Sequence, residues 1–253
     1  MSKTLYLECY SGISGDMTVA ALLDLGADRE VLKESLKSLP VGGFRTEITR
    51  VKKSGLDACD FSVILEQDNH DHDMEYLHGS EKTYTGHHEH SHEVNHEHHH
   101  GHTHSHEHPH EHRGMKEITE IIQKSEMTAR AKKMAMRVFD ILAQAESKAH
   151  GVPVEEVHFH EVGAVDSIVD IAAIAICMDN LDISNVIVPV LYEGTGFIRW
   201  QDGQIPVPVP AVTHIAETHK LKLKITDIQG ELVTPTGAAV VAAFRTSDRL
   251  PED

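Results

Sequence analysis

The chain has 253 residues and a formal net charge of −17 with its histidines neutral, because 40 Asp and Glu outnumber 23 Lys and Arg. This acidic balance makes nucleic acids and anionic membrane surfaces poor partners. Three scattered cysteines, an N-terminus without secretory features and apolar runs too short to span a bilayer lead us to expect a cytoplasmic protein.

Residues 1–67 predict the first part of a mixed α/β domain. Apolar residues alternate where strands are expected and recur every three to four positions where helices are expected. The predicted elements are a strand at 4–8, a glycine turn at 11–16, helices at 17–25 and 29–39, and a β-hairpin at 44–66 that turns at Lys53-Ser54-Gly55.

Residues 68–113 form an insert of different composition. Between His70 and His112 lie 17 of the chain's 22 histidines, together with nine Asp or Glu and a single lysine. Low hydrophobicity predicts disorder, and neutral imidazole suits late first-row divalent metals better than Mg or Ca. No fixed ligand spacing recurs, so a solvated linker that binds metal only incidentally is the alternative to a metal-collecting segment. The densest run of candidate metal ligands is His96, His98, His99, His100, His102, His104, His106, His108, His110 and His112.

Residues 114–253 predict the remainder of the domain. Long connections between mixed strands and helices indicate a mixed α/β (α+β) fold that carries the disordered His-rich insertion. The predicted elements are helices at 115–124 and 128–150, an apolar helix reaching Met178, a strand at 185–190, a glycine turn at 193–196, an extended Pro-rich segment at 205–210, a helix at 211–218, a strand at 221–228, and a last helix that runs from Thr234 to Phe244.

Two turns could bind an anion such as a phosphate. Each precedes a predicted helix, where backbone N–H groups and the helix dipole favour negative charge. The alternative is ordinary capping, by Ser14 or Asp16 in the first turn and by a Thr beside a Pro in the second. The candidate nucleotide-binding residues are Ser11, Gly12, Ser14 and Gly15 in the first turn, and Thr234, Thr236 and Gly237 in the second.

A third cluster combines imidazoles and carboxylates. On an extended segment His158 and His160 would share one face, with Glu161 beside them, while Asp166 and Asp170 share a face of the following helix. Carboxylates at this spacing repel each other unless a cation, an arginine or water intervenes, so a partly buried metal or polar site is expected. The alternative is that Asp166 caps the helix and both histidines bind backbone groups.

Four blocks of the sequence closely resemble the LarC family. They are LECYSGISGDM at residues 7–17, HFHEVGAVDSIVDI at 158–171, IPVPVPA at 205–211 and ELVTPTGAA at 231–239. The resemblance implies an enzyme, a nickel-inserting cyclometallase of the lyase or chelatase type. Such enzymes insert Ni(II) into pyridinium-3,5-bisthiocarboxylic acid mononucleotide and form one nickel–carbon and two nickel–sulfur bonds. The product is the nickel-pincer cofactor of lactate racemase and related enzymes, and the reaction depends on CTP and on Mn or Mg.

The resemblance also suggests roles for individual residues. A pyridinium carbon that binds nickel must lose its proton, so His158, His160 and Glu161 are candidates for the general base or for transient nickel ligands. Asp16, Asp166 and Asp170 are expected nearer a metal or a polar substrate group. Many relatives have His-Gly where this chain has Trp200-Gln201-Asp202-Gly203, which leaves a histidine role there without a candidate.

The resemblance implies that full-length members continue into a C-terminal nucleotide-binding domain, and we expect this domain to be absent from this chain. We therefore expect a separate C-terminal chain to supply the CTP and Mn or Mg sites, a lactate racemase-type apoenzyme to receive the cofactor, and an oligomeric assembly. The main alternative is a non-catalytic nickel or zinc store or metallochaperone in which the insert is the functional part. Another is a metal-dependent phosphohydrolase built on Asp16, Asp166 and Asp170.

Overall fold

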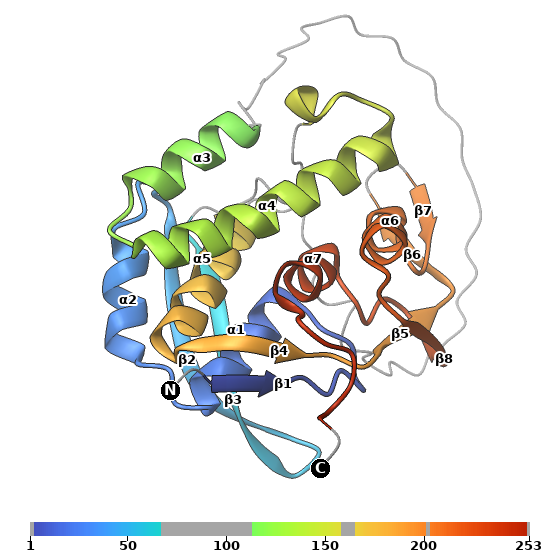
Figure 1. The fold of residues 1–253 in the computed structure, drawn as a ribbon, viewed down its shortest axis with the longest axis horizontal. Coiled ribbons are helices and arrows are strands. Elements are labelled where there is room, and N and C mark those ends of the chain that lie inside the picture. The colour runs from blue at the N-terminus through green and yellow to red at the C-terminus, as the bar shows by residue number, and fades with distance from the viewer. Residues whose placement is uncertain (1–2, 67–112, 158–164, 201–202, 252–253) are drawn as a thin grey trace, which may run out of the picture. The chain divides into compact units, whose positions relative to one another are not determined.

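The structure is a computed structural model that describes residues 3–66, 113–157, 165–200 and 203–251 (Figure 1). These ranges belong to one unit that contains both sides of the His-rich insert, while residues 69–111 are a separate unit outside the described residues. The helices are α1 (Gly15–Asp24), α2 (Arg29–Lys37), α3 (Met115–Lys124), α4 (Ala129–His150), α5 (Val165–Asn180), α6 (Pro210–His219) and α7 (Pro235–Phe244), with a 3-10 turn at Val154–Glu156. The strands are β1 (Lys3–Tyr6), β2 (Phe44–Lys53), β3 (Leu56–Leu65), β4 (Ile183–Ile187), β5 (Leu191–Thr195), β6 (Phe197–Trp200), β7 (Gly203–Pro206) and β8 (Leu223–Gln229). The predicted mixed α/β class is confirmed.

Local sequence signals set the ends of the helices. Asp28 caps α2 by accepting the N–H groups of Glu30 and Val31, and Thr128 caps α4 by accepting the N–H of Ala131. Gly151 ends α4 in the left-handed conformation, with φ 68°, which costs a glycine little. These signals are short-range, and the predicted helix boundaries therefore agree with the structure to within a few residues.

The sheets are short, and a few bridges connect them. Strand β1 pairs in parallel with β4, and β5 pairs in parallel with β8. After β1 the chain makes an isolated parallel bridge between Cys9 and Leu191 of β5, so the two pairs are linked through the N-terminal segment. Strands β2 and β3 form the predicted hairpin, with Ser54 and Gly55 at positive φ in the turn.

The prediction of a glycine turn at 193–196 is wrong in part. Residues 193–195 lie in β5, and the chain turns only at Gly196, where φ is 93°. A glutamate followed by Gly194 and Gly196 resembles a polar turn, but here the Glu193 side chain is buried at 0 % exposure. The tertiary partners of Glu193 therefore override the local turn preference.

Helix α5 is the central element of the core. Ten of its sixteen residues are buried, from Ile168 to Met178, as expected of a helix that is apolar on every side. Helix α4 lies across it in Figure 1, and α4 contacts α5, α6 and α7. Among the described residues, no helix combines the length and the apolar character that crossing a membrane requires.

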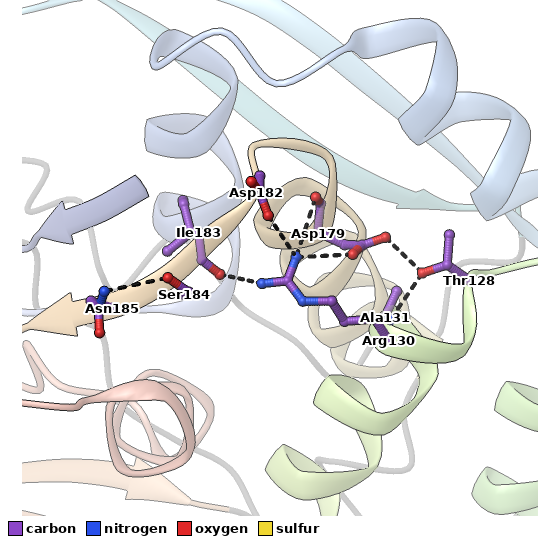
Figure 2. Close-up of polar contacts among 8 residues, drawn as sticks. All are labelled: Thr128, Arg130, Ala131, Asp179, Asp182, Ile183, Ser184 and Asn185. Carbon is purple, nitrogen blue, oxygen red and sulfur yellow. Dashed lines mark hydrogen bonds and ion pairs between the residues drawn. The ribbon is translucent and has the colours of Figure 1, made fainter. Parts of the chain in front are cut away.

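A polar cluster fixes the C-terminal end of α5 to the start of α4 (Figure 2). The Thr128 hydroxyl donates to Asp179 at 2.6 Å, and the Arg130 guanidinium donates to Asp179 at 3.1 Å and to the carbonyl oxygen of Ile183. One arginine thus bridges α5 and the start of β4. Because α5 is held at this end, the position of Asp166 and Asp170 at its other end is also constrained.

Candidate nucleotide and metal site

The two glycine turns predicted at opposite ends of the sequence lie side by side. Ile13 forms an isolated parallel bridge with Val233. Its N–H donates to the carbonyl oxygen of Leu232 at 2.9 Å, and its own carbonyl oxygen accepts the N–H of Thr234 at 3.1 Å. The N-termini of α1 and α7 are consequently neighbours, because each helix begins two residues after this bridge.

Glycines permit this close approach. A Cβ atom added to Gly12 would overlap the carbonyl oxygen of Leu232, and one added to Gly237 would overlap that of Ile13. Gly12 also has φ 81°, a conformation that other residues seldom adopt. Two of the three glycines that the sequence singled out in these turns, Gly12 and Gly237, are therefore required by backbone packing between the turns.

The capping roles left open by the sequence are present. Ser14 caps α1 by accepting the N–H of Met17 at 3.4 Å, and its hydroxyl donates to the Asp16 carboxylate. Thr234 caps α7 by accepting the N–H of Gly237 at 3.1 Å. Each cap satisfies one N–H of its first turn and leaves others without an intrahelical partner.

Asp170 lies against the N-terminus of α1. A Cβ atom on Gly15 would lie 2.6 Å from Oδ2 of Asp170, so Gly15 leaves room for this carboxyl group. Burial raises the pKa of Asp170 to about 8, the negative charges of Asp16 and Asp166 add to the rise, and a hydrogen bond from the Asp16 backbone opposes it. The three predicted acidic residues therefore share one neighbourhood.

Two oxygens in this neighbourhood have no partner among the residues that the structure describes. Oδ1 of Asp166 and Oδ1 of Asp170 are both buried, and neither accepts a hydrogen bond from those residues. A buried, unpaired carboxylate oxygen is costly and is one feature of a site that a cation can occupy. Within the described ranges, however, no three His, Cys, Asp or Glu side chains form a group that could hold a metal ion.

The remaining predicted ligands lie outside the described residues. These are the catalytic candidates His158, His160 and Glu161, and the whole run of insert histidines from His96 to His112. Their roles stay predictions.

Sequence reasoning missed a second pair of acidic residues, Glu193 and Glu231. Oε1 of Glu193 accepts three backbone N–H groups, while Oε2 is buried without a partner in the described part of the chain. Burial raises the pKa of Glu231 to about 7, and the nearby charge of Glu193 contributes. The signal that could have pointed to Glu193 is that it is the one acidic residue of β5, a short strand that begins with the buried Leu191.

Comparison with known proteins identifies the family. The profile of the family described as "Nickel insertion protein" matches residues 5–252. Three relatives named "Pyridinium-3,5-bisthiocarboxylic acid mononucleotide nickel insertion protein" match at high identity. The protein of Alkaliphilus metalliredigens is 52 % identical over 252 residues, covering 99 % of this chain and 54 % of the relative. That of Clostridium acetobutylicum is 44 % identical over 243 residues, covering 95 % and 55 %.

The third relative, from Geobacillus kaustophilus, is 40 % identical over 239 residues, covering 94 % of this chain and 50 % of the relative. No solved structure matches. The chain spans about half the length of the curated relatives it matches. Since the family profile covers nearly all of its residues, the chain belongs to the nickel insertion protein family, also called the LarC family.

Proposed function

We propose that this chain is the part of a nickel insertion enzyme that binds the nucleotide substrate and nickel. The substrate is pyridinium-3,5-bisthiocarboxylic acid mononucleotide, and the product is the nickel-pincer cofactor delivered to a lactate racemase-type apoenzyme. Family membership supports the reaction class. The observation that carries the site is the meeting of the α1 and α7 N-termini beside the unpaired oxygens of Asp166 and Asp170.

The nucleotide phosphate is assigned to the paired helix N-termini. The two helix dipoles, together with the first-turn N–H groups that the caps and Asp170 leave unpaired, favour an anion between the Ser14 and Thr234 caps. The predicted residues Ser11, Gly12, Ser14, Gly15, Thr234, Thr236 and Gly237 all belong to these two turns.

The acidic residues are assigned to the metal. Asp166 and Asp170 offer oxygen ligands, and Asp16 is close enough to Asp170 to raise its pKa. Two carboxylates alone hold a divalent ion weakly, so the remaining ligands would come from the substrate sulfurs or from His158, His160 and Glu161. Nickel–carbon bond formation releases the ring proton, which one of these three residues or a carboxylate must accept.

CTP and Mn or Mg are assigned to the part of the relatives that this chain does not span. That part would act as a separate C-terminal chain or as a continuation of the polypeptide. We also propose that the working assembly is an oligomer. These assignments rest on the relatives' greater length, since this chain covers 50–55 % of the three compared here.

The direct test is a reconstitution. The chain, with and without the C-terminal half of a relative, is incubated with the dithiocarboxylated nucleotide, Ni(II), CTP and Mn(II), and the metallated nucleotide is detected by its nickel isotope pattern in mass spectrometry. Product is expected only when both halves are present, and Asp166→Asn with Asp170→Asn should reduce it by at least about tenfold. Full activity of that double variant would contradict the assigned metal site.

Deletion of residues 70–112 separates an insertase from a nickel store. With excess nickel, an insertase keeps its turnover without the insert and loses only metal uptake at low nickel concentration. A store or metallochaperone would lose its function altogether. Hydrolysis of nucleotides by the chain alone would instead favour the phosphohydrolase alternative.

A further inference from the structure

Glu193 is a fully buried carboxylate that binds backbone outside its own strand. At 0 % exposure it is the most buried acidic side chain among the described residues. Its Oε1 accepts the N–H groups of Gly194 at 2.7 Å, Leu232 at 2.8 Å and Val233 at 3.1 Å. Backbone N–H donors that converge on one oxygen stabilise its negative charge and compensate for lost hydration.

The segment that Glu193 holds has no regular secondary structure of its own. Leu232 and Val233 lie between the end of β8 at Gln229 and the start of α7 at Pro235. Their N–H groups therefore have no helix or strand ladder to join, and the carboxylate takes the place of that partner. At the end of β5, the Gly230 N–H donates to the Thr195 carbonyl oxygen at 2.9 Å, which fixes the beginning of the same segment.

The same segment also binds the first glycine turn, at residues 11–16. The carbonyl oxygen of Leu232 accepts the N–H of Ile13, and Gly12 packs directly on that oxygen. One residue further along each chain segment are the two caps, Ser14 of α1 and Thr234 of α7. A chain of hydrogen bonds thus leads from one carboxylate through Leu232 to both helix N-termini.

We infer that Glu193 is a positioning residue that sets the placement of the α1 and α7 N-termini relative to each other, and thereby the site for the substrate's phosphate. The inference deepens the proposed function. Its statement about the phosphate site rests on that function, whereas its statement about the two helix N-termini does not. Glu193 itself does not touch the phosphate, because its side chain is fully buried. Its role is carried by the Leu232–Val233 backbone.

The first test measures amide hydrogen exchange by NMR in the full-length, metal-free chain. Glu193→Leu removes the acceptor with a side chain of similar size, and Glu193→Gln keeps one acceptor oxygen without the charge. Exchange should become roughly tenfold faster or more in Glu193→Leu, at Leu232 and Val233 and also at Ile13 and the first turn of α1, which Glu193 does not touch. Glu193→Gln should be intermediate, and it carries the test if Glu193→Leu does not fold.

Glu231→Gln is the matched control. Glu231 lies on the same segment near Glu193, and among the described residues its side chain makes no hydrogen bond. The Ile13 amide of this variant should therefore exchange at the wild-type rate. Amides of α4 serve as an internal reference. Faster exchange confined to Leu232 and Val233, with Ile13 and α1 unchanged, would overturn the inference.

The second test uses nicotinic acid mononucleotide, which has the pyridinium ring, ribose and 5′-phosphate, and measures its binding by calorimetry. Glu193→Gln should weaken binding by roughly tenfold while Glu231→Gln leaves it within about twofold. Equal affinities in the wild type and Glu193→Gln would refute the positioning role. A wild-type chain that does not bind the probe would contradict the proposed phosphate site, whereas the exchange result would still decide whether Glu193 couples the two turns.

Discussion

Buried carboxyl groups dominate the chemistry of this protein at the scale of single residues. Asp170 and Glu231 both have raised pKa values, in each case chiefly because burial disfavours the charged form. A carboxyl group of this kind either keeps a proton or exchanges it for a cation. The unpaired oxygens of Asp166 and Asp170 make the second possibility the basis of the proposed metal site.

Asp170→Asn should make the metal-free protein less sensitive to pH. The pKa of Asp170 is about 8 in the folded chain, against 3.8 for an ordinary aspartic acid side chain, so the folded state binds this proton more tightly than the unfolded state. The resulting stabilisation is complete below about pH 4 and is lost as the pH rises through about 8. Between pH 5 and pH 8.5 the wild type should lose at least about 1 kcal/mol more free energy of unfolding than the variant.

Urea denaturation with a chelator present measures this difference. The exposed Asp227 provides the control substitution, Asp227→Asn, which should follow the wild-type pH dependence. An Asp170→Asn variant that also follows the wild type would show that this carboxyl group is not shielded from water.

Gly237→Ala should destabilise the contact between the two turns. The new methyl group would overlap the carbonyl oxygen of Ile13, and relieving that overlap must separate the turns. We expect a loss of about 1–3 kcal/mol in the free energy of unfolding, as for other overpacked sites. Gly42→Ala is the control, because a Cβ atom there meets nothing within 4 Å, and it should change stability by less than about 0.5 kcal/mol. Equal effects at both positions would contradict the contact.

At the scale of elements, α5 connects the core to the site. Its apolar middle is buried between the hairpin, α1, α2 and α4, its N-terminal turn carries Asp166, and its C-terminal end is held by the cluster in Figure 2. Because a helix is stiff, fixing one end also limits the movement of the acidic residues at the other.

Arg130→Met should loosen this end of α5. The substitution removes the ion pair with Asp179 and the hydrogen bond to Ile183 while keeping most of the apolar stem. The guanidinium is partly exposed, so the loss should be about 1 kcal/mol in the free energy of unfolding. Lys33→Met removes an exposed helical ion pair with Glu30 and should cost less than about 0.5 kcal/mol. Equal melting temperatures for the two variants would contradict a stabilising role for the polar cluster around Arg130.

At the scale of the whole molecule, the folded unit and the His-rich insert differ in composition and in expected role. The insert holds 17 of 22 histidines, and most of the apolar residues lie outside it. The proposed division is that the insert concentrates nickel while the folded unit holds the substrate.

Nickel bound by the chain should fall steeply on mild acidification. Imidazole binds metal only when neutral and has an unperturbed pKa of about 6.5, so protons compete with nickel as the pH drops. Equilibrium dialysis with elemental analysis should find several nickel ions per chain at pH 7.5 and less than about a tenth of that number at pH 5.5. Deleting residues 70–112 should remove most of the bound nickel at pH 7.5. Unchanged binding after the deletion would place the nickel elsewhere.

Much of the fold could be predicted because its signals are local. Caps such as Asp28 and Thr128, the Gly151 stop and the Ser54-Gly55 turn act within a few residues, and the resulting elements agree with the structure. The β5 boundary could not be predicted, since the partners of Glu193 come from a segment distant in the sequence. Asp16, Asp166 and Asp170 were expected near one metal or polar group, but the two turns were predicted separately, without their mutual contact.

The sequence by itself determined the helices, the hairpin, the composition of the insert and the family, because each depends on residue type at short spacing. Only the tertiary structure decided that the Gly12 and Gly237 turns touch, that Asp170 packs on Gly15, and that the buried Glu193 accepts backbone N–H groups from Leu232 and Val233. These features depend on long-range backbone hydrogen bonds and on the exclusion of water, which no local pattern encodes.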